Sequence, residues 1–130
     1  MPSNQAKSTE DPAPASAGPT ILIVDDEDDL RESLAELLEE EGYRVEMAPN
    51  GLLGLTRLQD GTRPSVVLLD IHMPLMTGVE VFAAMRDTPA LAGLPVVFMT
   101  SDPSRAPAGV PIVKKPVDLR RLLALVGQLC

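Results

Sequence analysis

The chain has 130 residues and a formal net charge of −8, and 45% of its residues are hydrophobic but only 2% are aromatic. This length suggests one domain, and the hydrophobic share is enough for a core of Leu, Val, Ile, Met and Ala. The acidic balance argues against nucleic acid or an anionic membrane surface as a partner, because both require a basic footprint.

Apolar runs of strand length alternate with segments of helical period from Thr20 onwards. Residues 1–19, rich in Pro, Ala and Ser, are predicted to form a flexible tail before one domain at residues 20–130. We predict strands within residues 20–26, 43–48, 65–71, 94–101 and 109–116, and helices within residues 29–42, 50–61, 77–89 and 118–130. This alternation indicates an α/β fold with a doubly wound parallel sheet and helices on both faces.

The ends and inward faces of the helices follow from the same patterns. Asp28 or Asp29 can cap the first helix, Gly42 can end it, and Asn50 can cap the second. Glu27, Asp28 and Asp29, the last three acids of the run DDEDD, fit a solvated helix start. The inward faces are expected to carry Val79, Phe82 and Met85 in the third helix and Leu119, Leu122, Leu123 and Val126 in the last.

The crossover between Thr100 and Lys115 has no helical pattern. Its sequence, SDPSRAPAGVPIVK, contains three prolines and a glycine, which leave no room for a regular helix of ordinary length. We expect a loop or a single distorted turn there.

The cellular location can be predicted from three further observations. No apolar stretch approaches the roughly 18 residues of a spanning helix, and the N-terminus lacks the order of a secretory signal. The single cysteine, Cys130, cannot form an internal disulfide. We therefore expect a reducing, cytoplasmic location.

Polar residues stand at the carboxyl ends of four predicted strands, where functional groups of a doubly wound sheet gather. They are Asp25 and Asp26, Asp70, Thr100 and Ser101, and Lys114 and Lys115. Clustered carboxylates repel one another unless a cation compensates, and oxygen ligands without His or Cys favour Mg²⁺, with Mn²⁺ or Ca²⁺ as alternatives. A nearby ammonium and hydroxyl suit a bound anion. The set therefore predicts a phosphoryl site, with one carboxylate as a candidate covalent acceptor.

The blocks ILIVDDE, LLDIHMPLMTG, VVFMTS and VKKP resemble, in this order, the signature blocks of response regulator receiver domains. The resemblance covers Thr20 to Leu129. It implies a flavodoxin-like sheet with strand order 2-1-3-4-5 in a bacterial two-component phosphorelay protein. It also implies a sensor histidine kinase or a histidine phosphotransfer protein as phosphoryl donor, and a downstream protein as receiver of the signal. The only implied catalysis is the chain's own phosphorylation and dephosphorylation, so we do not expect an enzyme.

The resemblance assigns a role to each residue that matches the phosphoryl-binding part of the pattern. Asp70 matches the phosphoacceptor, and Thr100 matches the hydroxyl that turns to hydrogen-bond the phosphoryl oxygen. Lys115 matches the lysine that pairs with the phosphate, with Lys114 as a competitor for this role from position alone. Pro116 matches the proline that commonly follows a cis peptide bond.

The implied metal site combines four residues. Asp26 matches the principal acidic Mg²⁺ ligand, and Asp25 the acid beside it, which often acts through water. Asp70 completes the carboxylate set, and His72 lies where the family uses a backbone carbonyl as a ligand. As the only histidine, His72 also fits an ordinary polar loop residue.

Two features depart from the family pattern. Ile112 stands where the family commonly has an aromatic residue that rotates with the threonine. The segment from Thr100 to Lys115 is also shorter by roughly two helical turns. We therefore expect the fourth helix to be shortened or missing, with intact acceptor chemistry and an altered readout. We hypothesise that the loop from Ser101 to Val110 replaces this helix as the switch.

Three other functions stay open at this point. The altered switch region favours a pseudo-receiver that is not phosphorylated, whereas the complete acidic set argues against it. A hydrolase of the haloacid dehalogenase type would need a second acid two residues after the nucleophile, where this chain has His72. A flavin-binding module would need a phosphate loop after the first strand, where the run DDEDD would repel a phosphate without a cation.

Overall fold

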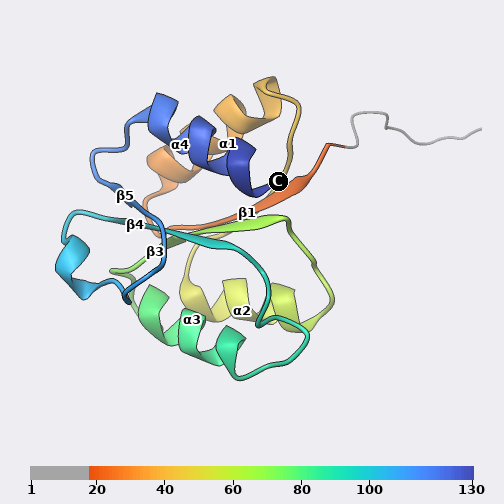
Figure 1. Ribbon diagram of the computed structural model, residues 1–130, viewed down its shortest axis with the longest axis vertical. Coiled ribbons are helices and arrows are strands. Elements are labelled where there is room, and N and C mark those ends of the chain that lie inside the picture. The colour runs from red at the N-terminus through yellow and green to blue at the C-terminus, as the bar shows by residue number, and fades with distance from the viewer. Residues whose placement is uncertain (1–17) are drawn as a thin grey trace, which may run out of the picture.

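Five short strands form one parallel sheet in the order β2-β1-β3-β4-β5 (Figure 1). The structure, a computed structural model, describes residues 18–130. The strands are β1 (Thr20–Val24), β2 (Arg44–Ala48), β3 (Val66–Asp70), β4 (Val96–Thr100) and β5 (Ile112–Lys114). The inner strands β1, β3 and β4 are buried almost throughout, which explains their continuous apolar sequences. The predicted fold class and strand order are confirmed.

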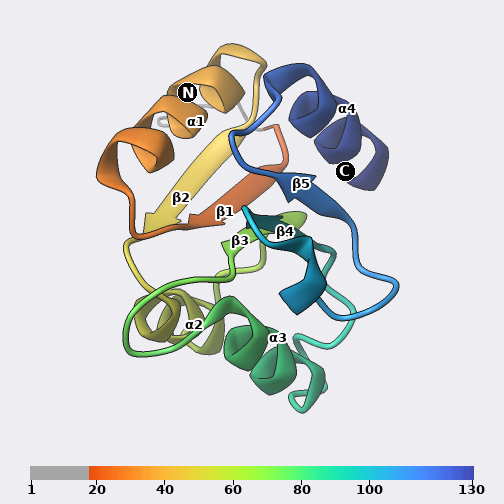
Figure 2. The same cartoon turned by 90° about the vertical axis from the view of Figure 1, so that its left-hand side faces the viewer.

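Two helices cover each face of the sheet (Figures 1 and 2). They are α1 (Asp28–Glu40) and α4 (Leu119–Leu129) on one face, and α2 (Gly51–Gln59) and α3 (Gly78–Arg86) on the other. Successive residues of β1 alternate between the two faces: Ile21 and Ile23 pack under α1 and α4, whereas Leu22 and Val24 pack under α2 and α3. Each face therefore buries its own half of the core.

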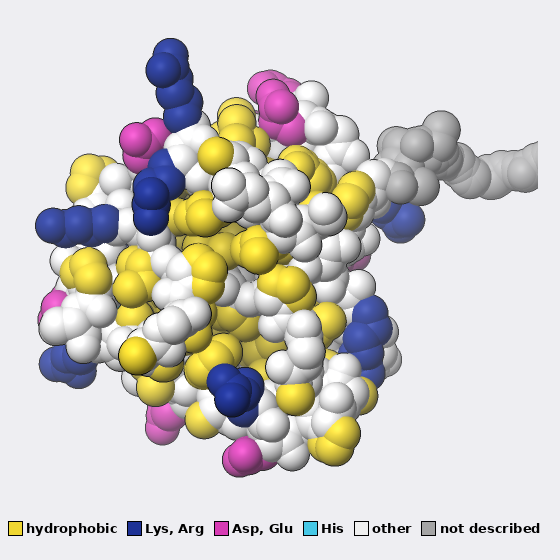
Figure 3. Space-filling model, viewed as in Figure 1, with side chains coloured by type: hydrophobic (Ala, Val, Ile, Leu, Met, Phe, Trp, Pro, Cys, Tyr) yellow, Lys and Arg dark blue, Asp and Glu magenta, His cyan; other side chains and the backbone are white. Residues whose placement is uncertain are grey.

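The crossover from β4 to β5 contains a single 3₁₀ turn, η1 (Pro103–Arg105), at the place where the resemblance implies a fourth helix. The described chain has no α-helix between these strands, so the prediction that the fourth helix is shortened or missing is confirmed. Half-buried apolar side chains pack against the core at this place, namely Phe82, Ala106, Val110 and Ile112. In Figure 3, which has the view of Figure 1, hydrophobic side chains reach the surface between α4 near the top and α3 near the bottom.

The strand β5 forms one edge of the sheet and has only three residues. Its ladder to β4 uses the Pro111 carbonyl and the Lys115 N–H, so the carbonyl of Ile112 between them points outward. Arg121 of α4 lies across this edge, and its Nη2 donates a hydrogen bond of 3.2 Å to the Ile112 carbonyl.

The helix ends and inward faces are mostly as predicted. Asn50 caps α2, and Gly42, with a φ of +96°, follows the C-cap residue of α1. Leu122 and Val126 of α4 are fully buried, but Leu119 is 47% exposed. The inward orientation predicted for Leu119 was wrong: it is the first residue of the helix, and only later residues of α4 pack into the core.

The start of α1 differs from the prediction of an aspartate cap. Glu27 occupies the N-cap position without a side-chain cap, and Asp28 and Asp29 lie in the first turn. Asp25 Oδ1 accepts a hydrogen bond of 2.8 Å from the Glu27 N–H. This bond from the preceding strand end sets where the helix begins, one residue earlier than an Asp28 cap would allow.

The predicted tail at residues 1–19 falls mainly on residues 1–17, which lie outside the described part of the chain. The first described element begins at Thr20 and the last ends at Leu129. Among the helices within residues 18–130, none combines the length and the apolar character that crossing a membrane requires.

Candidate functional site

The carboxyl ends of the strands meet at one edge of the sheet, which faces the viewer in Figure 2. Asp25 directly follows β1, Asp70 ends β3, Thr100 ends β4, and Lys115 directly follows β5. Because the strands are parallel and adjacent, these residues come together from positions up to 90 apart in the sequence. The backbone therefore positions the site before any side-chain contact is considered.

Three carboxylates gather at this edge. Asp25, Asp26 and Asp70 each offer an oxygen atom, and these oxygens lie within 4.8 Å of one another. Asp25 is fully buried and Asp70 is 3% exposed, whereas Asp26 faces solvent. Two buried acids this close cannot both ionise cheaply without a compensating positive charge.

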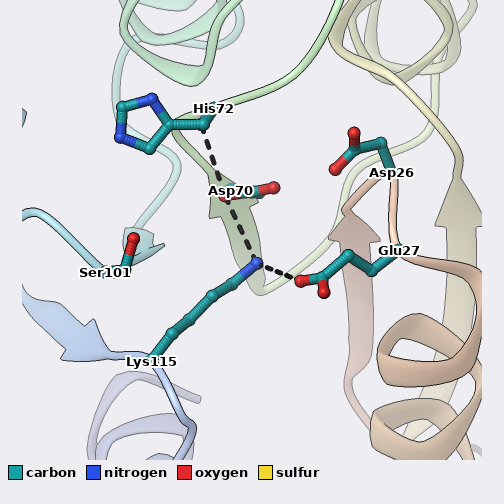
Figure 4. Close-up of a pocket in the computed structure, with 6 residues that line it drawn as sticks. All are labelled: Asp26, Glu27, Asp70, His72, Ser101 and Lys115. Atoms are coloured by element: carbon teal, nitrogen blue, oxygen red, sulfur yellow. Dashed lines mark hydrogen bonds and ion pairs between the residues drawn. The ribbon is translucent and has the colours of Figure 1, made fainter.

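Lys115 supplies a positive charge at the centre of the cluster (Figure 4). Its Nζ lies 2.8 Å from Glu27 Oε1 and 3.1 Å from Asp25 Oδ2. Asp70 Oδ1 is more distant, at 3.5 Å. Burial alone would lower the pKa of Lys115, but its hydrogen bonds to Glu27 and Asp25 raise that pKa above the ordinary value. The ammonium is therefore charged at neutral pH.

The acceptor candidate Asp70 has the most perturbed carboxyl group of the site. Burial, and after it the nearby charge of Asp25, raise its pKa from 3.8 to about 7. Lys115 and the hydrogen bond from the His72 N–H to Asp70 Oδ1 (3.3 Å) lower it only in part. The cluster therefore carries more negative charge than Lys115 neutralises.

The backbone around Asp70 is closely packed. A Cβ atom on Gly78, the first residue of α3, would lie 2.2 Å from the Asp70 carbonyl oxygen. The Gly78 N–H donates a hydrogen bond of 2.9 Å to the Ile71 carbonyl. The loop after β3 thus folds back onto the strand end, and glycine permits this approach because it has no side chain.

An open cleft of about 320 Å³ lies above the carboxylates. It is lined by Asp26, Glu27, Asp70, His72, Ser101 and Lys115 (Figure 4). Every residue of this lining is polar or charged, and the cleft is open to solvent. A small anionic group could therefore reach the Asp70 carboxylate from outside.

The hydroxyl of Thr100 does not line this cleft. Thr100 is fully buried, and its Oγ1 accepts a hydrogen bond of 3.0 Å from the Asp102 N–H. The same hydroxyl lies 3.3 Å from the Asp102 carbonyl oxygen, to which it donates. The Thr100 side chain is therefore tied to the start of the β4–β5 crossover, and its predicted contact with a phosphoryl oxygen requires a rotation.

His72 lies across the cleft from Glu27, with its ring exposed (Figure 4). Its N–H contacts Asp70, and the predicted role of its carbonyl as a metal ligand stays a prediction. The Lys115–Pro116 peptide bond is cis, as the resemblance implies. Lys114 is exposed and lies outside the cleft lining, so Lys115 is the lysine of the site.

One cleft residue, Glu27, was not predicted from the sequence as a site residue. Glu27 is a helix N-cap, as expected for an acid at a helix start, but its carboxylate also contacts Lys115. Ser101, predicted at the same strand end as Thr100, lines the cleft, whereas Thr100 does not. Glu27 directly follows the two site acids in sequence, and this adjacency was the available signal.

Comparison with known proteins gives a consistent result. A family model described as the response regulator receiver domain matches residues 21–127. The response regulator receiver protein CpdR of Brucella abortus is 36% identical over 110 residues, which cover 79% of this chain and 89% of CpdR. The response regulator MprA of a Mycobacterium species is 37% identical over 116 residues, which cover 84% of this chain but 49% of MprA. The chain thus spans most of one relative and about half the length of the other.

Two solved structures have the same fold. The signal receiver domain of a signal transduction histidine kinase from Syntrophus aciditrophicus has a TM-score of 0.76 and 32% identity, covering 86% of this chain and 89% of that chain. The receiver domain of the sensor histidine kinase PA1611 from Pseudomonas aeruginosa has a magnesium ion coordinated in its active-site cleft. Its TM-score is 0.78 at 22% identity, covering 87% of this chain and 98% of that chain, a likeness of fold alone.

Proposed function

This chain belongs to the response regulator receiver family, and on that basis we propose that it is a phosphoacceptor in a two-component phosphorelay. Asp70 takes a phosphoryl group from the phosphohistidine of a sensor histidine kinase or a histidine phosphotransfer protein. The observation that carries this proposal is the environment of the Asp70 carboxylate. It is 3% exposed at a central strand end, near two further acids and 3.5 Å from Lys115 Nζ.

The three carboxylates fit a divalent cation. They supply only oxygen ligands within 4.8 Å of one another. The pKa of Asp70 is raised first by burial and then by repulsion from Asp25, and a cation would relieve this repulsion. We assign Mg²⁺, with Mn²⁺ as the alternative, to Asp25, Asp26, Asp70 and the His72 carbonyl. When bound, the cation neutralises negative charge on the transferred oxygens.

The residues of the chain itself have separate roles in the transfer. One Asp70 oxygen forms the new bond to phosphorus while the phosphorus–nitrogen bond of the phosphohistidine breaks, and the bonding electron pair leaves with the imidazole. The Lys115 ammonium attracts the phosphoryl oxygens and offsets their charge. The Thr100 hydroxyl rotates away from Asp102 to donate a hydrogen bond to a phosphoryl oxygen.

The proposed phosphoryl donor is supported by a similar solved structure, and the proposed cellular location by the charge of the chain. The Syntrophus aciditrophicus receiver domain is part of a histidine kinase, which supports a histidine kinase as the source of the phosphoryl group. The chain then signals through contacts with a downstream protein and has no substrate of its own, so it is not an enzyme. We place it in the cytoplasm, without a nucleic acid or membrane partner, in keeping with its net charge of −8.

A pseudo-receiver that binds without being phosphorylated is the second candidate. The short crossover from β4 to β5 favours it, because the single turn η1 replaces the helix through which this family commonly signals. Ile112 also replaces the aromatic residue of the usual switch. The intact set of three acids and a lysine favours phosphorylation instead.

Intact-mass spectrometry after incubation with acetyl phosphate and Mg²⁺ tests the proposal. We expect the wild type to gain one phosphoryl group and Asp70→Asn to gain none. Asp28→Asn, which removes an exposed acid of the same run, is the matched control and should be phosphorylated like the wild type. Absence of an adduct on the wild type would favour the pseudo-receiver, and steady turnover of unrelated phosphomonoesters would favour a hydrolase.

A further inference from the structure

The Glu27 side chain makes a contact that its position at a helix start does not require. Its carboxylate is 60% exposed, yet its Oε1 lies 2.8 Å from Lys115 Nζ, the shortest of the three acid contacts of this ammonium. Glu27 is held in place by its own N–H, which donates to Asp25 Oδ1 (2.8 Å). The backbone at residue 27 is extended, so the side chain reaches across the cleft and not along the helix.

Lys115 is therefore shared unequally among the acids. Its Nζ donates hydrogen bonds to Glu27 and to Asp25, whereas Asp70 lies at 3.5 Å without such a bond. The Lys115 side chain is only 16% exposed, so few water molecules can replace a lost partner. Any anion that binds above Asp70 must attract this ammonium away from a partner it already has.

We propose that Glu27 is a positioning residue that competes with the phosphoryl group on Asp70 for Lys115. This inference rests on the proposed function and deepens it, since it identifies a residue that sets how strongly the phosphorylated state is held. A phosphoryl group on Asp70 extends into the cleft that Glu27 and Lys115 line. Glu27 must then release Lys115 or remain beside a second anion, and both outcomes weaken phosphoryl binding.

Beryllium fluoride provides a direct probe, because with Mg²⁺ it forms a trifluoroberyllate group of phosphoryl size on an aspartate. We expect Glu27→Gln to bind this probe roughly three- to tenfold more tightly than the wild type, the range for a partly exposed charged contact. Gln keeps the size of the side chain and removes only its charge. Isothermal titration calorimetry at fixed Mg²⁺ measures the affinity.

Asp28→Asn provides the matched control for loss of one negative charge. Asp28 is the next residue, its side chain is 75% exposed, and its contact is with Arg31 at 2.7 Å and not with Lys115. Its probe affinity should stay within about twofold of the wild type. An equal gain in Asp28→Asn and Glu27→Gln would overturn the proposal, because net charge alone would then explain both.

The Lys115→Met background shows whether Glu27 acts through the lysine. We expect Glu27→Gln to change probe affinity by less than about twofold in that background. An undiminished gain there would mean direct repulsion between Glu27 and the anion, and the competition for Lys115 would be excluded. Mg²⁺ affinity without the probe should be nearly unchanged in Glu27→Gln, and a parallel change would make Glu27 part of the cation site, against the proposal.

The wild type separates failure of this inference from failure of the proposed function. If it neither binds the probe nor accepts a phosphoryl group from acetyl phosphate, the phosphoacceptor function fails and the role of Glu27 fails with it. If it does both but Glu27→Gln has the wild-type probe affinity, only the role of Glu27 is wrong.

Discussion

The protonation of Asp70 couples the stability of the folded chain to pH. In the unfolded chain this carboxyl group ionises near its ordinary pKa of 3.8, whereas burial in the folded chain raises the pKa to about 7. Between these values the folded state binds more protons than the unfolded state. The free energy of unfolding therefore decreases as pH rises from about 4 through about 7, and it levels off once Asp70 is fully ionised in the folded chain.

For the cation-free protein, we predict that Asp70 lowers the free energy of unfolding at pH 8 relative to pH 5 by on the order of 2 kcal/mol. Asp70→Asn should lack this part of the pH dependence, because an amide does not titrate. Added Mg²⁺ should restore much of the loss at pH 8, since it binds the ionised carboxylate. Urea denaturation with and without Mg²⁺ measures these differences, and the same pH dependence in both proteins would contradict the assignment.

The positions of individual site residues could be predicted where the strand order alone determines them. Asp25, Asp70 and Lys115 stand at the ends of apolar strands, so their convergence follows from parallel strand order. The side-chain contacts could not be predicted in the same way. The contact of Glu27 with Lys115 and the bond of Thr100 to the main chain depend on side-chain torsions, which no sequence period specifies.

The short crossover between β4 and β5 is linked to the site through one hydroxyl group. Thr100 Oγ1 accepts the Asp102 N–H, and Asp102 Oδ1 in turn accepts the Ser104 N–H at the start of η1. If Thr100 turns towards a phosphoryl oxygen, the Asp102 N–H loses its partner. The crossover then has a physical route by which to respond to phosphorylation.

We predict that beryllium fluoride with Mg²⁺ changes amide hydrogen exchange at Asp102 and in the η1 turn. Exchange at Asp102 should become faster, because its N–H is released from Thr100. Thr100→Ala serves as the control, since its Asp102 amide should exchange fast from the start and respond little to the probe. Unchanged protection in this segment, with changes elsewhere in the wild type, would show that it is not the switch.

The start of α3 is held against the end of β3 by Gly78. A Cβ atom there would meet the Asp70 carbonyl oxygen at 2.2 Å, so Gly78→Ala must displace the strand end or the helix. We predict a loss of unfolding free energy of roughly 2 kcal/mol or more, together with slower phosphorylation by acetyl phosphate.

Gly93→Ala is the matched control for the Gly78 variant, because a Cβ atom at Gly93 meets nothing within 4 Å. It should leave stability and phosphorylation nearly unchanged, as measured by urea denaturation and intact mass. Equal effects of the two substitutions would mean that the close approach to Asp70 has no special importance.

Elements could be predicted well where composition restricts the backbone and less well at their first residues. Three prolines exclude a helix from the β4–β5 crossover whatever its neighbours are. The start of α1 was wrong by one residue because several consecutive acids can all occupy a helix N-terminus. Asp25, at the end of the preceding strand, selects among them by accepting a local hydrogen bond from the Glu27 N–H.

At the scale of the whole molecule, the two-sided core explains why the fold was predictable. The inner strands are buried on both faces and therefore read as unbroken apolar runs, while each helix presents one apolar side to the sheet. Parallel strands then bring the functional residues to one edge. On the face left without a fourth helix, half-buried Ala106, Val110 and Ile112 pack against the core.

The position of Arg121 affects how readily one molecule can associate with another through the edge of its sheet. An edge strand offers free main-chain groups to which a strand of another molecule can add, and such pairing begins many aggregates. Here β5 has three residues, and its outward Ile112 carbonyl already accepts a hydrogen bond from the Arg121 guanidinium. The charged group also lies where an incoming strand would have to dock. This sheet edge is thereby protected against intermolecular β-pairing.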